Sequence, residues 1–67
     1  MIIGLYADEA HRLRPDVWVN VWEVVDGRAE FYGDCRVEDL DVSDSNYGLE
    51  PVDEEGRAIA LEDALKL

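Results

Sequence analysis

The chain has 67 residues, which limits it to one small domain, because a chain of this size has too little apolar surface for a second core. Its hydrophobic content of 48%, aromatic residues included, excludes a disordered acidic tail. Seventeen acidic residues against six basic ones give a formal net charge of −11, which solubility does not require and which disfavours direct binding to nucleic-acid phosphates.

The start of the chain and its cysteine content indicate the compartment. The first apolar run ends at Asp8 and is far shorter than the roughly 20 residues of a membrane span or the core of a signal peptide. Cys35 is the single cysteine, so an internal disulfide is impossible and a reducing compartment is favoured. We therefore expect a cytoplasmic protein, in the host-cell cytoplasm if a phage encodes it, with no membrane partner.

Three β-rich segments follow one another along the chain. Residues 2–7 are apolar and predict a first strand, and residues 8–15 predict a loop or one helical turn. Residues 16–25 and 29–38 predict two longer strands, the second from its strict alternation of side chains. Between these strands Asp26-Gly27 favours a two-residue type I′ turn, so the two strands should form a hairpin.

The hairpin register predicts which face of the sheet is buried. An uninterrupted ladder from the turn places Trp22 opposite Phe31 and Trp18 opposite Cys35. Because tryptophan is too large for so small a protein to leave exposed twice, we expect the tryptophan face to be the core. Cys35 should then be a buried, inert thiol beside Trp18.

The opposite face of the hairpin poses two questions. It carries Val17, Val19 and Val21, which either lie under the first strand and the loops or join a partner surface. It also places Glu23 opposite Glu30, and directly opposed like charges destabilise a hairpin. Such a violation of good sheet design tends to mark function or strain.

The remaining chain predicts a loop and a short helix. Residues 39–56 are rich in turn formers, and Ala58, Leu61 and Leu65 have helical spacing from a start near Ala60. Residues 1–67 are expected to form a single α+β domain, with the C-terminal helix on the tryptophan face of a three-stranded antiparallel sheet. The sheet becomes four-stranded if residues 57–60 form a strand instead.

Catalytic and metal-binding motifs are weak. His11 is the single histidine and has no recognisable catalytic partner, so we expect neither an enzyme nor a cofactor. Counting from Asp39, oxygen-bearing side chains occupy positions 1, 3, 5 and 12 of an EF-hand-like loop, but the sixth position holds Asp44 where glycine is needed. We expect no metal, and a calcium-responsive loop remains an alternative that calcium-dependent melting would reveal.

The negative charge is concentrated in the middle of the chain. Between Asp16 and Glu55 lie 13 acids and only Arg28 and Arg36. Acids two apart on a strand are about 6.6 Å from one another, close to the interval between successive phosphates of a DNA strand. The segment is therefore either a solvated surface or an imitation of nucleic acid. The candidate partner-binding residues are eight acids of the segment and two tyrosines as anchors: Glu23, Glu30, Tyr32, Asp34, Glu38, Asp39, Asp41, Asp44, Tyr47 and Glu50.

A very short, strongly acidic α+β chain without catalytic residues resembles the phage-encoded anti-CRISPR proteins and the wider group of DNA-mimic inhibitors. The resemblance covers the whole chain and consists of size, charge and expected fold. It implies an inhibitor that covers the positively charged nucleic-acid-binding surface of a target, such as a CRISPR effector subunit, and blocks DNA recognition. The alternative is an antitoxin-like structural or regulatory module, monomeric or homodimeric, that acts through its valine face.

Overall fold

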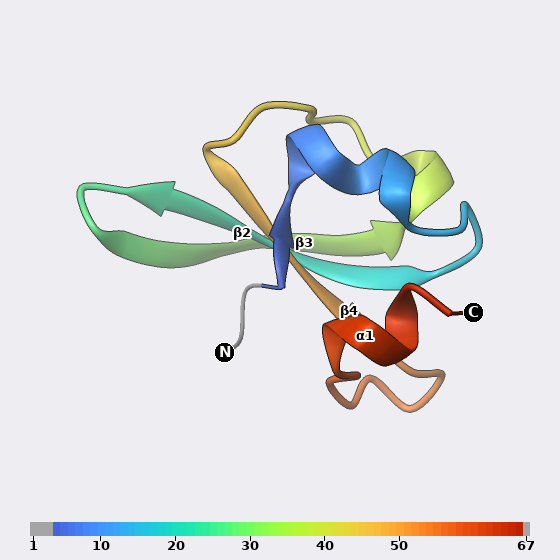
Figure 1. Ribbon diagram of the computed structural model, residues 1–67. Helices are drawn as coiled ribbons and strands as arrows, with labels where there is room; N and C mark the ends of the chain where they lie inside the picture. Colours follow the sequence, from blue (N-terminus) through green and yellow to red (C-terminus); the bar gives the residue numbers. More distant parts are fainter. Residues whose placement is uncertain (1–3, 67) are drawn as a thin grey trace.

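The protein is built on one four-stranded antiparallel sheet (Figure 1). The short helical segments η1 (Ala7–Arg12) and α1 (Leu61–Ala64) contribute side chains to a single buried cluster on one face of that sheet. The computed structural model describes residues 4–66, and the strand order in the sheet is β1-β4-β2-β3. Within the described residues, no helix has the length and apolar character needed to cross a membrane. In chain order the elements are β1 (Leu5–Tyr6), the 3₁₀ helix η1 (Ala7–Arg12), β2 (Trp18–Val25), β3 (Arg28–Arg36), the 3₁₀ helix η2 (Val37–Asp39), β4 (Tyr47–Val52) and the helix α1 (Leu61–Ala64).

The α+β class and the C-terminal helix are confirmed, and the sheet has four strands, the larger of the two predicted numbers. The fourth strand is not residues 57–60, where Ala58 makes only an isolated bridge to Val52. It is β4, which lies between β1 and β2 although its segment was expected to be loop. Gly48 and Pro51 hide the strand pattern, because both residue types are rare in central strands. Of the predicted first strand, residues 1–3 lie outside the described part of the chain, and only Leu5–Tyr6 pair as β1.

The β2–β3 hairpin forms as predicted near its turn. Asp26 and Gly27 have φ angles of 52° and 74°, the left-handed conformations that a type I′ turn requires. Trp22 opposes Phe31, as predicted, but a β-bulge follows, so that Val21 opposes Gly33. The bulge inserts one extra residue into β3. Every residue of β3 after the bulge therefore lies on the face opposite to the one that an uninterrupted ladder predicts.

The bulge makes the predicted pairing of Trp18 with Cys35 wrong. Trp18 opposes Arg36, and Cys35 opposes Val19. The guanidinium carbon of Arg36 lies 5.4 Å from the centre of the Trp18 ring, a cation–π arrangement. Cys35 therefore packs half-buried against the valine face.

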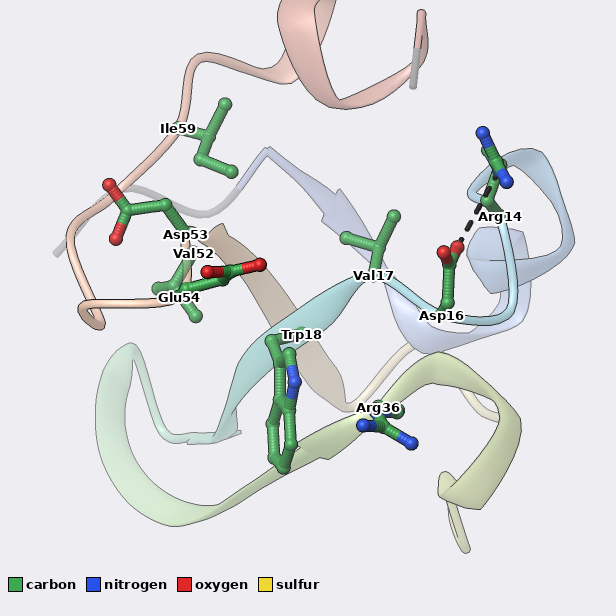
Figure 2. Close-up of a pocket in the computed structure, with 9 residues that line it drawn as sticks. All are labelled: Arg14, Asp16, Val17, Trp18, Arg36, Val52, Asp53, Glu54 and Ile59. Atoms are coloured by element: carbon green, nitrogen blue, oxygen red, sulfur yellow. Dashed lines mark ion pairs between the residues drawn. The ribbon is translucent and has the colours of Figure 1, made fainter.

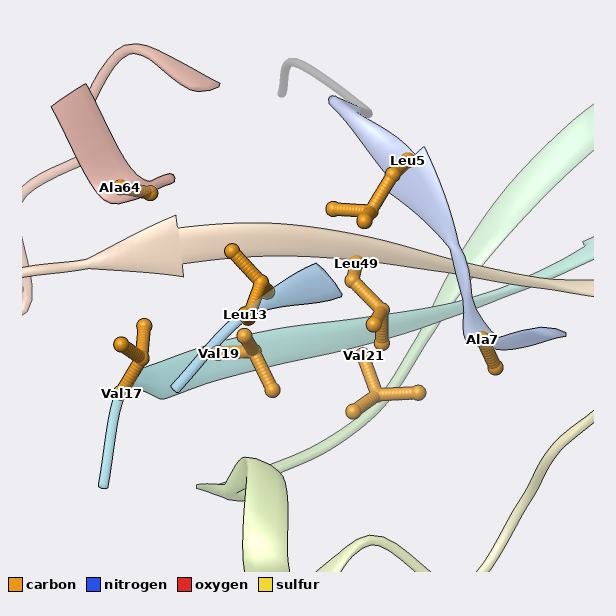
Figure 3. Close-up of a cluster of buried hydrophobic side chains, with 8 residues drawn as sticks. All are labelled: Leu5, Ala7, Leu13, Val17, Val19, Val21, Leu49 and Ala64. Carbon is orange, nitrogen blue, oxygen red and sulfur yellow. The ribbon is translucent and has the colours of Figure 1, made fainter. Parts of the chain in front are cut away.

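The buried face of the sheet is the valine face, which corrects the prediction that the tryptophans form the core. Val19 and Val21 are fully buried, and α1 packs on this face through Ala64, not on the tryptophan face (Figure 3). The valine surface that the antitoxin-like alternative requires is therefore inside the molecule. The buried hydrophobic residues are Leu5, Ala7, Leu13, Val17, Val19, Val21, Leu49 and Ala64, with Val52 at the end of β4.

The tryptophan face of the sheet is open to solvent, and we call it the open face. The pairing of all four strands places Tyr6, Gly48, Trp22 and Phe31 in one row across it. Tyr6 and Trp18 are each 39% exposed and Phe31 is 57% exposed. Both faces of β2 are strongly apolar, so the elements that cover the valine face decide which one becomes the core.

Candidate partner-binding surface

The acidic side chains gather where the hairpin end of the valine face emerges from the core. Glu23 follows Val21 on the same side of β2, opposite Tyr47 on β4 and Glu30 on β3. The Tyr47 ring contacts the ring of Tyr32, with centroids 5.0 Å apart and an interplanar angle of 67°. Tyr32 is the extra residue of the bulge and 47% exposed, so the two rings form an aromatic centre with carboxylates around it.

The electrostatics around Tyr47 reflect these carboxylates. Partial burial raises the pKa of the Tyr47 hydroxyl, and the charges of Glu23 and Asp44 and a hydrogen bond from the hydroxyl to the Glu23 carboxylate raise it further. Asp44 is positioned by a turn in which its carboxylate accepts a hydrogen bond of 3.0 Å from the backbone N–H of Asn46. The Tyr47 hydroxyl therefore keeps its proton, and its hydrogen bond to Glu23, to a higher pH than an ordinary tyrosine would.

A second group of acids adjoins the aromatic centre through Tyr32. The segment from η2 into the next loop brings Asp39 and Asp41 back over β3, where they line a cavity of about 200 Å³ with Tyr32, Asp34 and Cys35. Burial raises the pKa of the Cys35 thiol, and the charges of Asp39, Asp41 and Asp34 raise it further. A thiol in such a negative environment forms little thiolate at neutral pH, so it is a poor nucleophile.

These residues form what we call the acidic surface. The ion pairs of the described residues do not involve any of its carboxylates. Arg12, Arg14 and Arg57 pair instead with acids close to them in the sequence, for example Arg12 with Glu9 at 3.0 Å within η1. The acidic surface consists of Glu23, Glu30, Asp39, Asp41 and Asp44 with Tyr32 and Tyr47. Asp34 adjoins it on the edge strand β3, where it lies opposite Asn20 on the open-face side.

Two of the residues predicted to bind a partner lie apart from the acidic surface. Glu38 is 3.9 Å from Arg36, which offsets its charge. Glu50 is buried in β4 on the open-face side and accepts a hydrogen bond of 3.2 Å from Asn20. Glu50 therefore has a role inside the fold, and its burial also removes the twelfth ligand from the EF-hand-like loop. Among the described residues no group of three or more potential ligands lies close enough to hold a metal ion.

A larger hollow lies at the other end of β2 (Figure 2). Its volume is about 500 Å³, and Val17, Trp18, Val52 and Ile59 supply its apolar lining. Figure 2 shows Arg14 and Asp16 on one side and the loop with Asp53 and Glu54 on the other. Sequence reasoning missed this hollow, because it depends on the placement of β4 and of the loop that follows it.

The chain was compared with protein-family models, with curated proteins and with solved structures, and none of these matches it.

Proposed function

We propose that the protein binds a basic, nucleic-acid-handling protein through its acidic surface and excludes nucleic acid from that protein by occupying its basic groove. The observation that carries the proposal is a group of carboxylates that take part in no ion pair of the described residues: Glu23 and Asp44 lie beside Tyr47, and Asp39 and Asp41 line a cavity with Tyr32. A carboxylate without a cation of its own keeps its full negative charge for a partner. Complementary charge of this kind speeds association and sets its specificity.

The architecture supports the proposal in a second way. The like-charge pair of Glu23 and Glu30 sits on paired strands, where it lowers the stability of the hairpin. A small domain has little stability to lose, so a local cost of this kind is typical of residues kept for binding. Tyr32 supplies exposed aromatic area between the acids, and tyrosines in such positions are enriched among residues that dominate binding energy.

The proposal also implies a target class. A groove that reads DNA with arginines, such as the surface of a CRISPR effector subunit that recognises a short duplex motif, presents the cations that the acidic surface lacks. The protein would compete with DNA for those arginines and would not contact nucleic acid itself. Its binding should weaken as salt rises, because salt screens exposed charges beyond about 10 Å at 0.1 M.

The proposal is tested by immobilising the protein and comparing which lysate proteins are captured by the parent and by two variants of equal net charge. One variant neutralises the acidic surface (Glu30→Gln, Asp39→Asn, Asp41→Asn), and the other neutralises exposed acids elsewhere (Asp8→Asn, Glu62→Gln, Asp63→Asn). Basic nucleic-acid-binding proteins from a cell lysate should bind the parent and the second variant, elute with salt, and bind the first variant far less. Equal capture by the two variants would show that net charge, not the acidic surface, is responsible.

The open face favours a second candidate function, self-association into a homodimer. Tyr6, Trp18 and Phe31 leave apolar area exposed, and such patches commonly mark interfaces. Salt distinguishes this candidate, because two copies of net charge −11 repel each other and would associate more tightly as salt screens that repulsion. Sedimentation at two salt concentrations, with Phe31→Ser as the variant expected to be monomeric, tests it. A parent protein that stays monomeric at high salt contradicts it.

A further inference from the structure

The hollow between β2 and the loop after β4 has an unusual balance of charge. Its charged lining consists of Arg14, Asp16, Arg36, Asp53 and Glu54. Arg14 lies 3.5 Å from Asp16, and Arg36 pairs with Glu38 at 3.9 Å. Each guanidinium that lines the hollow therefore already has a carboxylate partner.

The carboxylates on the opposite side differ from each other. The Asp53 carboxylate accepts backbone hydrogen bonds from Glu55 and Arg57 and pairs with the Arg57 guanidinium at 3.4 Å. Glu54 is exposed, and the ion pairs of the described part of the chain do not include it. One negative charge in the hollow is thus left without a cation.

The apolar lining suits the stem and the planar head of a basic side chain. Trp18 remains 39% exposed with Arg36 stacked over its ring, Val52 lies opposite it on β4, and Ile59 lines another part of the hollow. A guanidinium stacks on indole and pairs with a carboxylate through two parallel hydrogen bonds, which an ammonium group does less well. A volume of about 500 Å³ leaves room for one such side chain in a hollow that is open to solvent.

We propose that this hollow is a binding site for one arginine side chain of a peptide or protein, with the guanidinium on Glu54 and the stem on Trp18 and Val52. The site lies apart from the acidic surface and does not depend on the function proposed for that surface. A basic partner long enough to reach both would be held at two places.

Nuclear magnetic resonance tests the site with Nα-acetyl-arginine amide as the probe. The chain has two tryptophans, so Trp22 serves as an internal reference for the indole N–H signal of Trp18. The Trp18 signal should shift and saturate at millimolar probe while the Trp22 signal stays in place. Nα-acetyl-citrulline amide, which has nearly the same shape and no charge, should leave both signals unchanged.

Two variants identify the residues responsible. Glu54→Gln should weaken probe binding up to about fivefold, the range of an exposed ion pair. Trp18→Leu should abolish binding, and because this variant lacks the Trp18 indole, its binding is followed by the backbone N–H signals of Val52 and Ile59 in the same hollow. Glu62→Gln removes one charge from α1 and should change nothing, so it controls for net charge.

Equal shifts with the citrulline probe, or equal affinity in Glu54→Gln and Glu62→Gln, would overturn the proposal. A Trp18 shift caused by inorganic phosphate instead of the arginine probe would assign the hollow to anions, through Arg14 and Arg36. Charge changes on the acidic surface play no part here, so failure of this proposal and failure of the proposed function are distinguishable.

Discussion

Replacing Glu30 by glutamine should stabilise the hairpin. Glu30 is exposed and faces Glu23 directly across β2 and β3. Two unit charges about 6 Å apart in water repel each other by about 0.7 kcal/mol, which agrees with the range of about 0.2–1 kcal/mol for a cross-strand pair. For a domain of this size the gain corresponds to a rise in melting temperature of about 3–5 °C. Glu30→Lys should gain roughly twice as much, because the repulsion becomes an attraction.

Urea denaturation with matched variants measures this gain. Glu54→Gln makes the same chemical change at an exposed loop position and reports the benefit of lower net charge alone. The extra gain of Glu30→Gln over Glu54→Gln should vanish when Glu23→Gln is already present, and it should fall in 1 M salt, where charges are screened within about 3 Å. An equal gain from the two single variants, or a gain that does not respond to salt, would refute the claim that Glu23 and Glu30 repel each other across the strands.

Further predictions concern the core, the turn and the titratable groups. Val19→Ala should cost about 2 kcal/mol of unfolding free energy, because Val19 is fully buried, whereas Phe31→Ala should cost less than about 1 kcal/mol, because Phe31 is largely exposed. If urea denaturation shows the larger loss for Phe31→Ala, the tryptophan face and not the valine face is the core. Gly27→Ala should cost about 1 kcal/mol, because residue 27 has a φ of 74°, and an unchanged melting temperature would contradict the type I′ turn. Folding raises the pKa of Cys35 above 9.0 and that of Tyr47 above 10.0, so at high pH the folded state keeps protons that the unfolded chain loses. The free energy of unfolding should therefore be constant just below pH 9 and fall as the pH rises above it. Cys35→Ser should remove the first part of that fall, and a stability that increases above pH 9 would contradict the raised pKa values.

Local chemistry in the sequence predicts the hairpin turn and the pairs next to it. Asp26-Gly27 permits the left-handed conformations of a type I′ turn, and from that turn the register of Trp22 with Phe31 follows. The bulge at Tyr32 has no comparable signal, because a single extra residue leaves the alternation of side chains on either side of it intact. One undetected bulge was enough to place Cys35 on the wrong face.

The choice of core and the fourth strand depend on contacts between distant parts of the chain. β-Branched and aromatic residues occupy both faces of β2, and the valine face becomes the core because η1 and α1 cover it. β4 contains Gly48 and Pro51, so its strand character appears only where β1 and β2 pair with it on both sides. The acidic surface was partly predictable, because Glu23 and Glu30 follow from the hairpin register, while the approach of Asp39 and Asp41 to Cys35 depends on the fold of η2 and its loop.

Displacement of DNA tests the central claim, that the geometry of the acidic surface and not the total charge makes the protein a competitor for a basic groove. A basic DNA-binding protein captured by the parent is loaded with fluorescein-labelled duplex, and the release of the duplex is followed by fluorescence anisotropy. The parent and the variant with Asp8→Asn, Glu62→Gln and Asp63→Asn should release the duplex at similar concentrations. The variant with Glu30→Gln, Asp39→Asn and Asp41→Asn, which has the same net charge, should need up to about a hundredfold more protein, since three exposed pairs contribute up to about 1 kcal/mol each. Equal release by the two variants would contradict the claim.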